Sequence, residues 1–208
     1  MSAHDPRSAE RILFVISGPS GSGKGSVVSR VQTRMENLSR VVTFTTRDPR
    51  PGESENNPYH FVSDGVFDEM LKSGEIFESE TVYGSYRYGS PREAVDREGG
   101  NDLIIELDTR GFRKMRETRK GPTVGLFLLV PDWETLAARI VDRNPEADLD
   151  RRLETAKIQI REAADYDYIF MNDELDRCCR DVERVCRAER IRRDGRRRHA
   201  FFMANDVS

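Results

Sequence analysis

The fold of this chain is decided by one stretch, Gly18-Pro19-Ser20-Gly21-Ser22-Gly23-Lys24-Gly25-Ser26. The apolar run 12–16 before it has the length and composition of a β-strand, and the valines of 27–31 after it recur at helical spacing. A strand, a glycine-rich loop and a helix in this order are the setting of a phosphate-binding loop. The glycines let backbone N–H groups converge on one anion, the helix N-terminus adds its dipole, and Lys24 adds a full charge. The stretch therefore predicts a nucleotide-phosphate site, against the simpler interpretation of a glycine-rich turn that starts a helix.

The residue after the lysine departs from the usual pattern of such loops. A Ser or Thr normally follows the lysine and its hydroxyl binds Mg²⁺, but here Gly25 stands at that place and the next hydroxyl belongs to Ser26. A shift of one residue on a helix turns a side chain by about 100°. We therefore favour Mg²⁺ held by phosphates and water alone, with Ser26 as the alternative ligand, and the metal ligands stay unknown.

Composition predicts one well-buried α/β domain with a charged surface. The 208 residues include 34 Lys and Arg against 37 Asp and Glu, a net charge of −3, which gives no general case for binding nucleic acid or an anionic membrane. No apolar run approaches the roughly 20 residues of a membrane helix, and residues 1–10 lack the apolar core of a signal peptide. The odd count of cysteines (Cys178, Cys179 and Cys186), all on one predicted helix, argues for packing in a reducing cytoplasm rather than for disulfides.

Two features beyond the loop carry possible site residues. The turn 46–53 is stiffened by two prolines and a glycine, and it presents Arg47 and Arg50 three residues apart. Exposed arginines are common, but downstream of a phosphate loop such a pair indicates a second phosphate clamp. The apolar run 102–108 predicts a buried strand that ends in Asp108, and ligands of parallel sheets lie at the carboxyl ends of strands.

The rest of the chain alternates between predicted helices and strands. We expect the first helix to run to about Leu38, and Trp133 to lie in the core or at a helix start. Further strands are predicted at 41–45, 76–83, 125–130 and 166–171, and further helices at 66–71, 91–98, 133–143, 151–164 and 175–186.

Taken in chain order, these motifs resemble the guanylate kinase family. The resemblance rests on the glycine loop, on Thr45-Thr46-Arg47-Asp48-Pro49-Arg50-Pro51-Gly52-Glu53, and on the motifs 59–62, 77–78, 88–90, 105–108, 172–176 and 187–190. It implies an α/β fold: a P-loop NTPase core with a central parallel sheet flanked by helices, a small α+β nucleoside-monophosphate-binding subdomain and a mobile lid. The expected division is a disordered tail at 1–10, a core at 11–41, 92–138 and 153–192, the subdomain at 42–91, the lid at 139–152, and a basic tail at 193–208.

The resemblance implies phosphorylation of GMP to GDP by ATP, with Mg²⁺ as cofactor. It assigns the glycine loop 18–26 and Asn172 to ATP. Catalytic roles fall to Lys24, Arg47, Arg139, Arg143 and Arg152. The GMP-binding set is Thr43, Arg47, Arg50, Tyr59, Glu78, Tyr88, Ser90 and Asp108. In that set the arginines and tyrosines hold the acceptor phosphate, Glu78 and Asp108 read the guanine, and Thr43 and Ser90 offer hydroxyls.

Departures from the family pattern keep alternatives open. One extra residue precedes the Tyr88 motif, so Tyr86 competes with Tyr88, and the lid is about two residues short with Asn144-Pro145 in place of a glycine. The alternatives are a kinase for dGMP or a modified purine monophosphate, and a non-catalytic binding module, against which Lys24 and the lid arginines argue. Arginines crowd the last 20 residues; self-association through this region is one interpretation, and a nucleic-acid arm is a weaker one.

Overall fold

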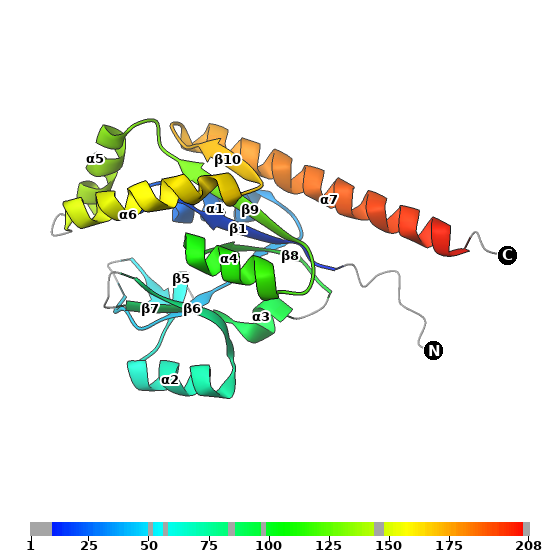
Figure 1. The fold of residues 1–208 in the computed structure, drawn as a ribbon, viewed down its shortest axis with the longest axis horizontal. Coiled ribbons are helices and arrows are strands. Elements are labelled where there is room, and N and C mark those ends of the chain that lie inside the picture. The colour runs from blue at the N-terminus through cyan, green and yellow to red at the C-terminus, as the bar shows by residue number, and fades with distance from the viewer. Residues whose placement is uncertain are drawn as a thin grey trace.

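The core of the protein is a parallel sheet covered by helices on both faces. The computed structural model describes residues 10–49, 52–55, 58–82, 86–96, 99–143 and 148–205. Its main sheet has the order β10-β9-β1-β8-β2, and every pairing is parallel. The strands are β1 (Leu13–Ser17), β2 (Leu38–Arg40), β8 (Asp102–Glu106), β9 (Thr123–Leu129) and β10 (Tyr168–Met171). The predicted fold class, an α/β core with a central parallel sheet flanked by helices, is confirmed (Figure 1).

Strand β1 explains why both faces are covered. Phe14 and Ile16 lie in the cluster that α1 (Lys24–Arg34) and α7 (Leu175–Asn205) cover, whereas Leu13 and Val15 lie in the cluster that includes Phe112 of α4 (Thr109–Thr118). Side chains alternate between the two faces of a strand. A strand that is buried at every position, as β1 is, therefore needs a covering layer on each side.

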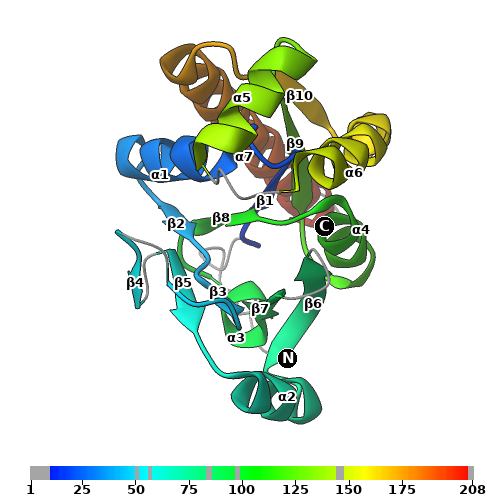
Figure 2. The ribbon, with the colours of Figure 1, turned by 90° about the vertical axis from the view of Figure 1, so that its left-hand side faces the viewer.

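A second, smaller sheet forms the lower part of the molecule in Figure 2. Its order is β4-β5-β3-β7-β6, and it mixes parallel and antiparallel pairs. The strands are β3 (Thr43–Thr45), β4 (Ser54–Glu55), β5 (Pro58–Phe61), β6 (Ile76–Val82) and β7 (Tyr86–Pro91), with the helices α2 (Asp64–Ser73) and α3 (Arg92–Asp96). The hairpin β6–β7 pairs Glu78 with Ser90, two of the predicted site residues.

The predicted lid corresponds to parts of two helices, α5 (Trp133–Arg143) and α6 (Leu149–Arg161). Leu136 and Ile140 of α5 pack with Ala156 of α6 in a small cluster separate from the two main ones. Asn144 and Pro145 fall outside the described residues, as do the family departures argued from them. Trp133 is the first residue of α5 and is largely exposed, so the helix-start interpretation holds and the core interpretation does not.

The first helix ends earlier than the sequence predicts. It stops at Arg34, Asn37 adopts a left-handed conformation (φ 57°), and Leu38–Arg40 then form β2, which pairs with β8. The expectation of a helix to Leu38 was wrong because a strand of three residues leaves no periodicity of its own. Pairing with β8 brings Arg40 to the edge of the sheet where the phosphate loop lies.

Helix α7 is much longer than expected and carries the basic segment. It is continuous to Asn205 and projects past the sheet in Figure 1, so the predicted boundary at residue 193 lies inside a helix. The cysteines Cys178, Cys179 and Cys186 are buried and unpaired against the main sheet, as their packing role predicts. Across the described ranges, no helix has the length and apolar character to cross a membrane.

A buried carboxylate fastens α7 to the sheet. Asp102, only 5% exposed, accepts hydrogen bonds from Arg190 and Arg193 at 2.7 Å each and from the backbone N–H of Ile12 at 2.8 Å. Arg190 also donates to the carbonyl oxygens of Glu36 and Asn37. One side chain thus joins β8, β1 and α7.

We predict that Asp102→Asn destabilises the protein by about 3 kcal/mol, because it leaves two arginines without their buried counter-charge. Urea unfolding followed by circular dichroism measures this change. Asp176→Asn, which removes the exposed partner of Arg30 and Arg34, is the matched control and should cost less than about 1 kcal/mol. Equal losses in the two variants would show that the Asp102 cluster is not a special anchor.

Candidate active site

The glycine loop has the backbone that an anion site needs. Gly18, Gly21 and Gly23 have positive φ values of 148°, 88° and 87°. A side chain at Gly18 would place its Cβ 2.5 Å from the carbonyl oxygen of Leu128, so only glycine fits there. Gly23 is the N-cap of α1 and leaves the first turn without a side-chain cap or an acidic residue. The first-turn N–H groups and the helix dipole are therefore available to an anion.

Lys24 folds back over the loop. Its Nζ donates to the carbonyl oxygens of Gly18 at 2.6 Å and Pro19 at 3.1 Å. Burial lowers the pKa of Lys24 to about 8, while the nearby carboxylate of Glu106 acts to raise it. An incoming polyphosphate would favour the charged form and replace the two carbonyl oxygens as partners.

The predicted donor-site residues lie together around this loop. Asn172, 3% exposed, donates through Nδ2 to the carbonyl oxygen of Ser22 at 2.7 Å. From α5 and α6, Arg139 donates to the carbonyl oxygen of Asn172 at 3.0 Å, and Arg152 donates to Ser20 Oγ at 3.3 Å. Arg143 lies close enough for its charge to lower the pKa of Lys24. Gly25 and Ser26 are exposed in the first turn of α1.

A second cluster surrounds Arg47. Its Nε donates to the Tyr88 hydroxyl at 3.3 Å, and one Nη atom donates to both carboxylate oxygens of Glu53 at 2.8 and 3.1 Å. The guanidinium carbon lies 5.7 Å from the ring centre of Tyr59, and the Tyr59 and Tyr88 rings meet edge to face at 5.5 Å. The structure thus brings Arg47, Tyr59 and Tyr88 together, while Arg50 lies outside the described residues.

The third cluster is a buried pair of carboxylates. Glu78, 3% exposed, accepts a hydrogen bond from Ser90 Oγ at 2.5 Å. Asp108 caps α4 and accepts from the N–H of Gly111 at 2.7 Å. A Cβ at Gly111 would lie 3.1 Å from Glu78 and 3.2 Å from Asp108, so the two acids meet at this glycine. Thr43 is buried at the start of β3, beside Tyr59 in the register of β5.

Burial sets the protonation of this acid pair. It raises the pKa of Glu78 to about 7, with the negative charge of Asp108 acting in the same direction and the Ser90 hydrogen bond opposing it. Burial also raises the pKa of Asp108, against the hydrogen bond from Gly111. Near neutral pH, Glu78 can therefore exist with or without its proton, which is typical of a site that awaits a ligand.

Three residues that lie in or beside these clusters were assigned no role from the sequence. Glu53 was quoted only as part of a motif, and Arg40 and Glu106 received no role. Arg40 donates to Glu106 at 2.5 Å across the ends of β2 and β8. Glu106 could have been identified from the sequence, because it lies two residues before Asp108 at the same end of the strand. Arg40 was missed because the first helix was predicted to run to about Leu38, which left no place for the short strand β2.

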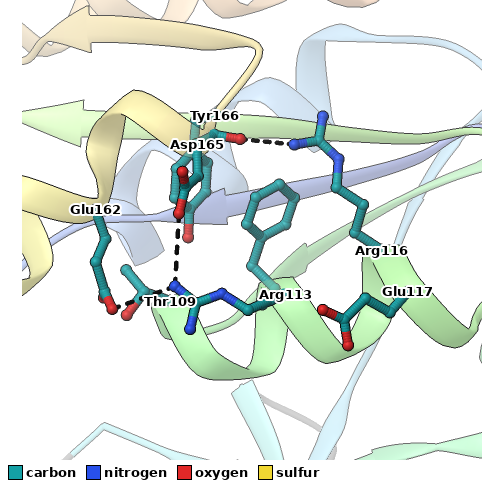
Figure 3. A pocket seen from close by; sticks show the side chains of 8 residues that line it. Thr109, Arg113, Arg116, Glu117, Glu162, Asp165 and Tyr166 are labelled. Atoms are coloured by element: carbon teal, nitrogen blue, oxygen red, sulfur yellow. Dashed lines mark hydrogen bonds and ion pairs between the residues drawn. The ribbon is translucent and has the colours of Figure 1, made fainter.

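A hollow of about 340 Å³ lies between α4 and the short helix η1 (Glu162–Asp165). None of the predicted site residues lines it. Its charged side chains pair with one another: Arg113 binds Glu162 and Asp165, and Arg116 donates to the carbonyl oxygen of Asp165 (Figure 3). The hollow therefore lies where α4 and η1 pack against each other, and the glycine loop with its neighbouring clusters remains the candidate site.

Metal binding by protein groups alone finds no support at this site. Where the structure describes the chain, no three His, Cys, Asp or Glu side chains gather in a way that could hold an ion. Near the glycine loop, the possible ligands include Ser26 and the carboxylates of Glu106 and Asp108, whose charges act on Lys24. Such a sparse set fits Mg²⁺, which keeps several waters and binds largely through substrate phosphates.

We predict that Glu78→Gln stabilises the protein at alkaline pH. With a pKa of about 7 in the folded state and about 4.3 in the unfolded state, wild-type Glu78 costs stability progressively as pH rises from 4.3 to 7, and fully above 7. At about 1.4 kcal/mol per pKa unit, this cost reaches the order of 3 kcal/mol. Urea unfolding at pH 5 and pH 8 should show the variant gaining on wild type at pH 8, whereas the exposed Glu154→Gln should not; a pH-independent difference would contradict the burial argument.

The comparisons with known proteins agree on one family. The guanylate kinase family model matches residues 10–189. A guanylate kinase of Alkalilimnicola ehrlichii is 38% identical over 86% of this chain and 90% of its own length, and one of Thiobacillus denitrificans is 34% identical over 95% and 96%. The crystal structure of guanylate kinase from Anaplasma phagocytophilum superimposes with a TM-score of 0.73 at 28% identity, covering 88% of this chain and 87% of the other. The resemblance predicted from the motifs is confirmed, and the chain belongs to the guanylate kinase family.

Proposed function

We propose that this protein transfers the γ-phosphoryl group of ATP to GMP, giving ADP and GDP. Family membership supports this activity, and one observation about the site carries it further. The charge of Glu106 acts on the pKa of both Lys24 in the glycine loop and Tyr59 in the Arg47 cluster. A loop suited to a donor's phosphates and a clamp suited to an acceptor's phosphate therefore border the same space.

Transfer of a phosphoryl group asks the protein mainly for positioning and charge. The N–H groups of the loop and the Lys24 ammonium hold the phosphates of ATP. Arg47, Tyr59, Tyr88 and Arg50 hold the phosphate of GMP, which is the nucleophile, and so fix its line of attack. Phosphates and water would hold Mg²⁺, whose charge would offset that of the transferring group.

The lid arginines complete this arrangement. Arg139, Arg143 and Arg152 lie on the two helices that adjoin the loop, and Arg139 and Arg152 already contact Asn172 and Ser20. Closure of these helices over bound nucleotides would bring the arginines to the transferring phosphates and exclude water, which otherwise competes as the acceptor.

Guanine is selected by hydrogen-bond direction. Its N1–H and N2 amine are two donors on one edge, and adenine has neither donor there. The ionised carboxylate of Glu78 accepts from both, with Asp108 beside it and the hydroxyls of Thr43 and Ser90 in the same subdomain. Bound adenine would offer no N–H donors to the buried carboxylate, which would keep only its hydrogen bond from Ser90 and bear a desolvation cost of several kcal/mol.

The assignment has accompanying parts that rest on the same reasoning. We assign residues 42–91 as the monophosphate-binding subdomain, 139–152 as the lid, and the cytoplasm as the location, which three buried unpaired thiols favour. The exposed side chains of Ile191, Phe202 and Met203 near the end of α7 support self-association through the C-terminal region.

An ADP-release assay across GMP, dGMP, AMP and modified purine monophosphates tests the reaction and its substrate. Activity with none of these monophosphates would overturn the proposed function.

We predict that Arg47→Ala raises the KM for GMP at least tenfold and the KM for ATP much less, because Arg47 belongs to the acceptor clamp. A coupled ADP-release assay with each nucleotide varied in turn measures both. A lower kcat should accompany the change, since a misplaced acceptor loses its line of attack. Equal increases in the two KM values would point instead to a general folding defect.

We also predict that Glu78→Gln reduces kcat/KM for GMP roughly 10- to 100-fold, because one hydrogen bond to a charged acceptor, worth about 1.5–3 kcal/mol, is lost. AMP loses nothing comparable, so the GMP:AMP ratio should fall. In wild type the KM for GMP should rise as pH falls below about 7, where Glu78 takes up its proton, and this rise should be absent in the variant. An unchanged GMP:AMP ratio would show that Glu78 does not read the base.

A further inference from the structure

One ion pair lies between the donor loop and the acceptor clamp without a role in either. Arg40 ends β2 and Glu106 ends the neighbouring strand β8, and the Arg40 Nη2 to Glu106 Oε1 distance is 2.5 Å. Both side chains are mostly buried, 16% and 17% exposed. A pair held this close and away from water is electrostatically stronger than an exposed one.

Glu106 faces the place where the donor's phosphates are expected. A Cβ on Gly25, in the first turn of α1, would lie 3.6 Å from Glu106 Oε2 and 3.8 Å from Oε1. The loop's lysine precedes Gly25 directly, and the charge of Glu106 acts on its ammonium group. A bare carboxylate at this position would repel an incoming polyphosphate and compete with it for Lys24.

Arg40 is placed to prevent this. Its guanidinium binds Glu106 on the side of β2, and its charge also acts on Tyr59 of the acceptor clamp. Arg40 thus supplies a positive charge that offsets the negative charge of Glu106, so that the phosphates of a donor and of an acceptor can both lie near this carboxylate.

We propose that Arg40 is a positioning residue for phosphoryl transfer: by neutralising Glu106 it lets the glycine loop accept the phosphates of ATP. The inference rests on the proposed function, because it names a further residue of the same site. It acts through Glu106 and requires no contact between Arg40 and the nucleotide.

Four variants test the inference through ATP binding rather than turnover. We would measure the dissociation constant for ATP by isothermal titration calorimetry in EDTA, so that any part of Glu106 in holding Mg²⁺ drops out. Arg40→Met should weaken binding roughly tenfold or more. Arg40→Met combined with Glu106→Gln should restore it to within about threefold of wild type, because the repelling charge is gone. Arg40→Lys, which keeps the charge, should also stay close to wild type.

The control removes an arginine from a neighbouring element, the helix α1, at a place away from Glu106. Arg30→Met on α1 breaks an exposed ion pair with Asp176, which keeps Arg34 as a partner, and should leave the affinity for ATP unchanged. Thermal melting of every variant separates misfolding from lost affinity.

Two outcomes would overturn the inference. If Arg40→Met binds ATP like wild type, Glu106 needs no neutralising partner. If the double variant binds as weakly as Arg40→Met, then Arg40 contacts the nucleotide or supports the fold directly and does not act through Glu106. Failure of the proposed function would be distinguishable, because wild type would then bind ATP without phosphorylating any monophosphate in the panel.

Discussion

The close approach of Gly18 to the backbone of β9 determines where everything else in the site must lie. The loop leaves β1 in the middle of the parallel sheet, with β8 on one side and β9 on the other. The register places Ser17 beside Phe127 and Ile16 beside Glu106, so three strands end at one edge. Parallel strands present their carboxyl ends together, and the loop, Glu106 and Asp108 therefore converge although 80 residues separate them in the chain.

Charge is the second constraint, and the protein pairs the cations of the site with its own oxygen atoms. Lys24 donates to two loop carbonyls, and Arg47 is held by Glu53, Tyr88 and the carbonyl oxygen of Asp48. These partners occupy donors that would otherwise bind phosphate. They keep the cations oriented in a partly buried space, and in the proposed function the substrate phosphates would replace one set of oxygens with another.

The sequence predicted those parts of the site that are local. The loop, its flanking strand and helix, and the strand ending in Asp108 all follow from short-range patterns. The burial of Glu78 did not, because Glu75, Glu78 and Glu80 are equivalent until the β6–β7 register pairs one of them with Ser90 under α4. The Arg40–Glu106 pair could not be predicted from the sequence either. The three-residue strand β2 has no periodicity of its own, and Glu106 lies 66 residues from Arg40 in the chain.

The buried acid pair shows why such a site is less stable than it could be. Apolar side chains could be buried at these positions without an electrostatic cost. Burial of Glu78 and Asp108 instead raises the pKa of both carboxyl groups, because it disfavours their charged forms. In the proposed function, this resistance to ionisation would help to separate guanine from adenine. Glu78, which accepts one hydrogen bond from Ser90, would gain most from a ligand bearing two N–H donors and little from one that lacks them. On this proposal, the stability given up at neutral pH would be recovered when guanine binds, and selectivity would follow from the same burial that weakens the fold.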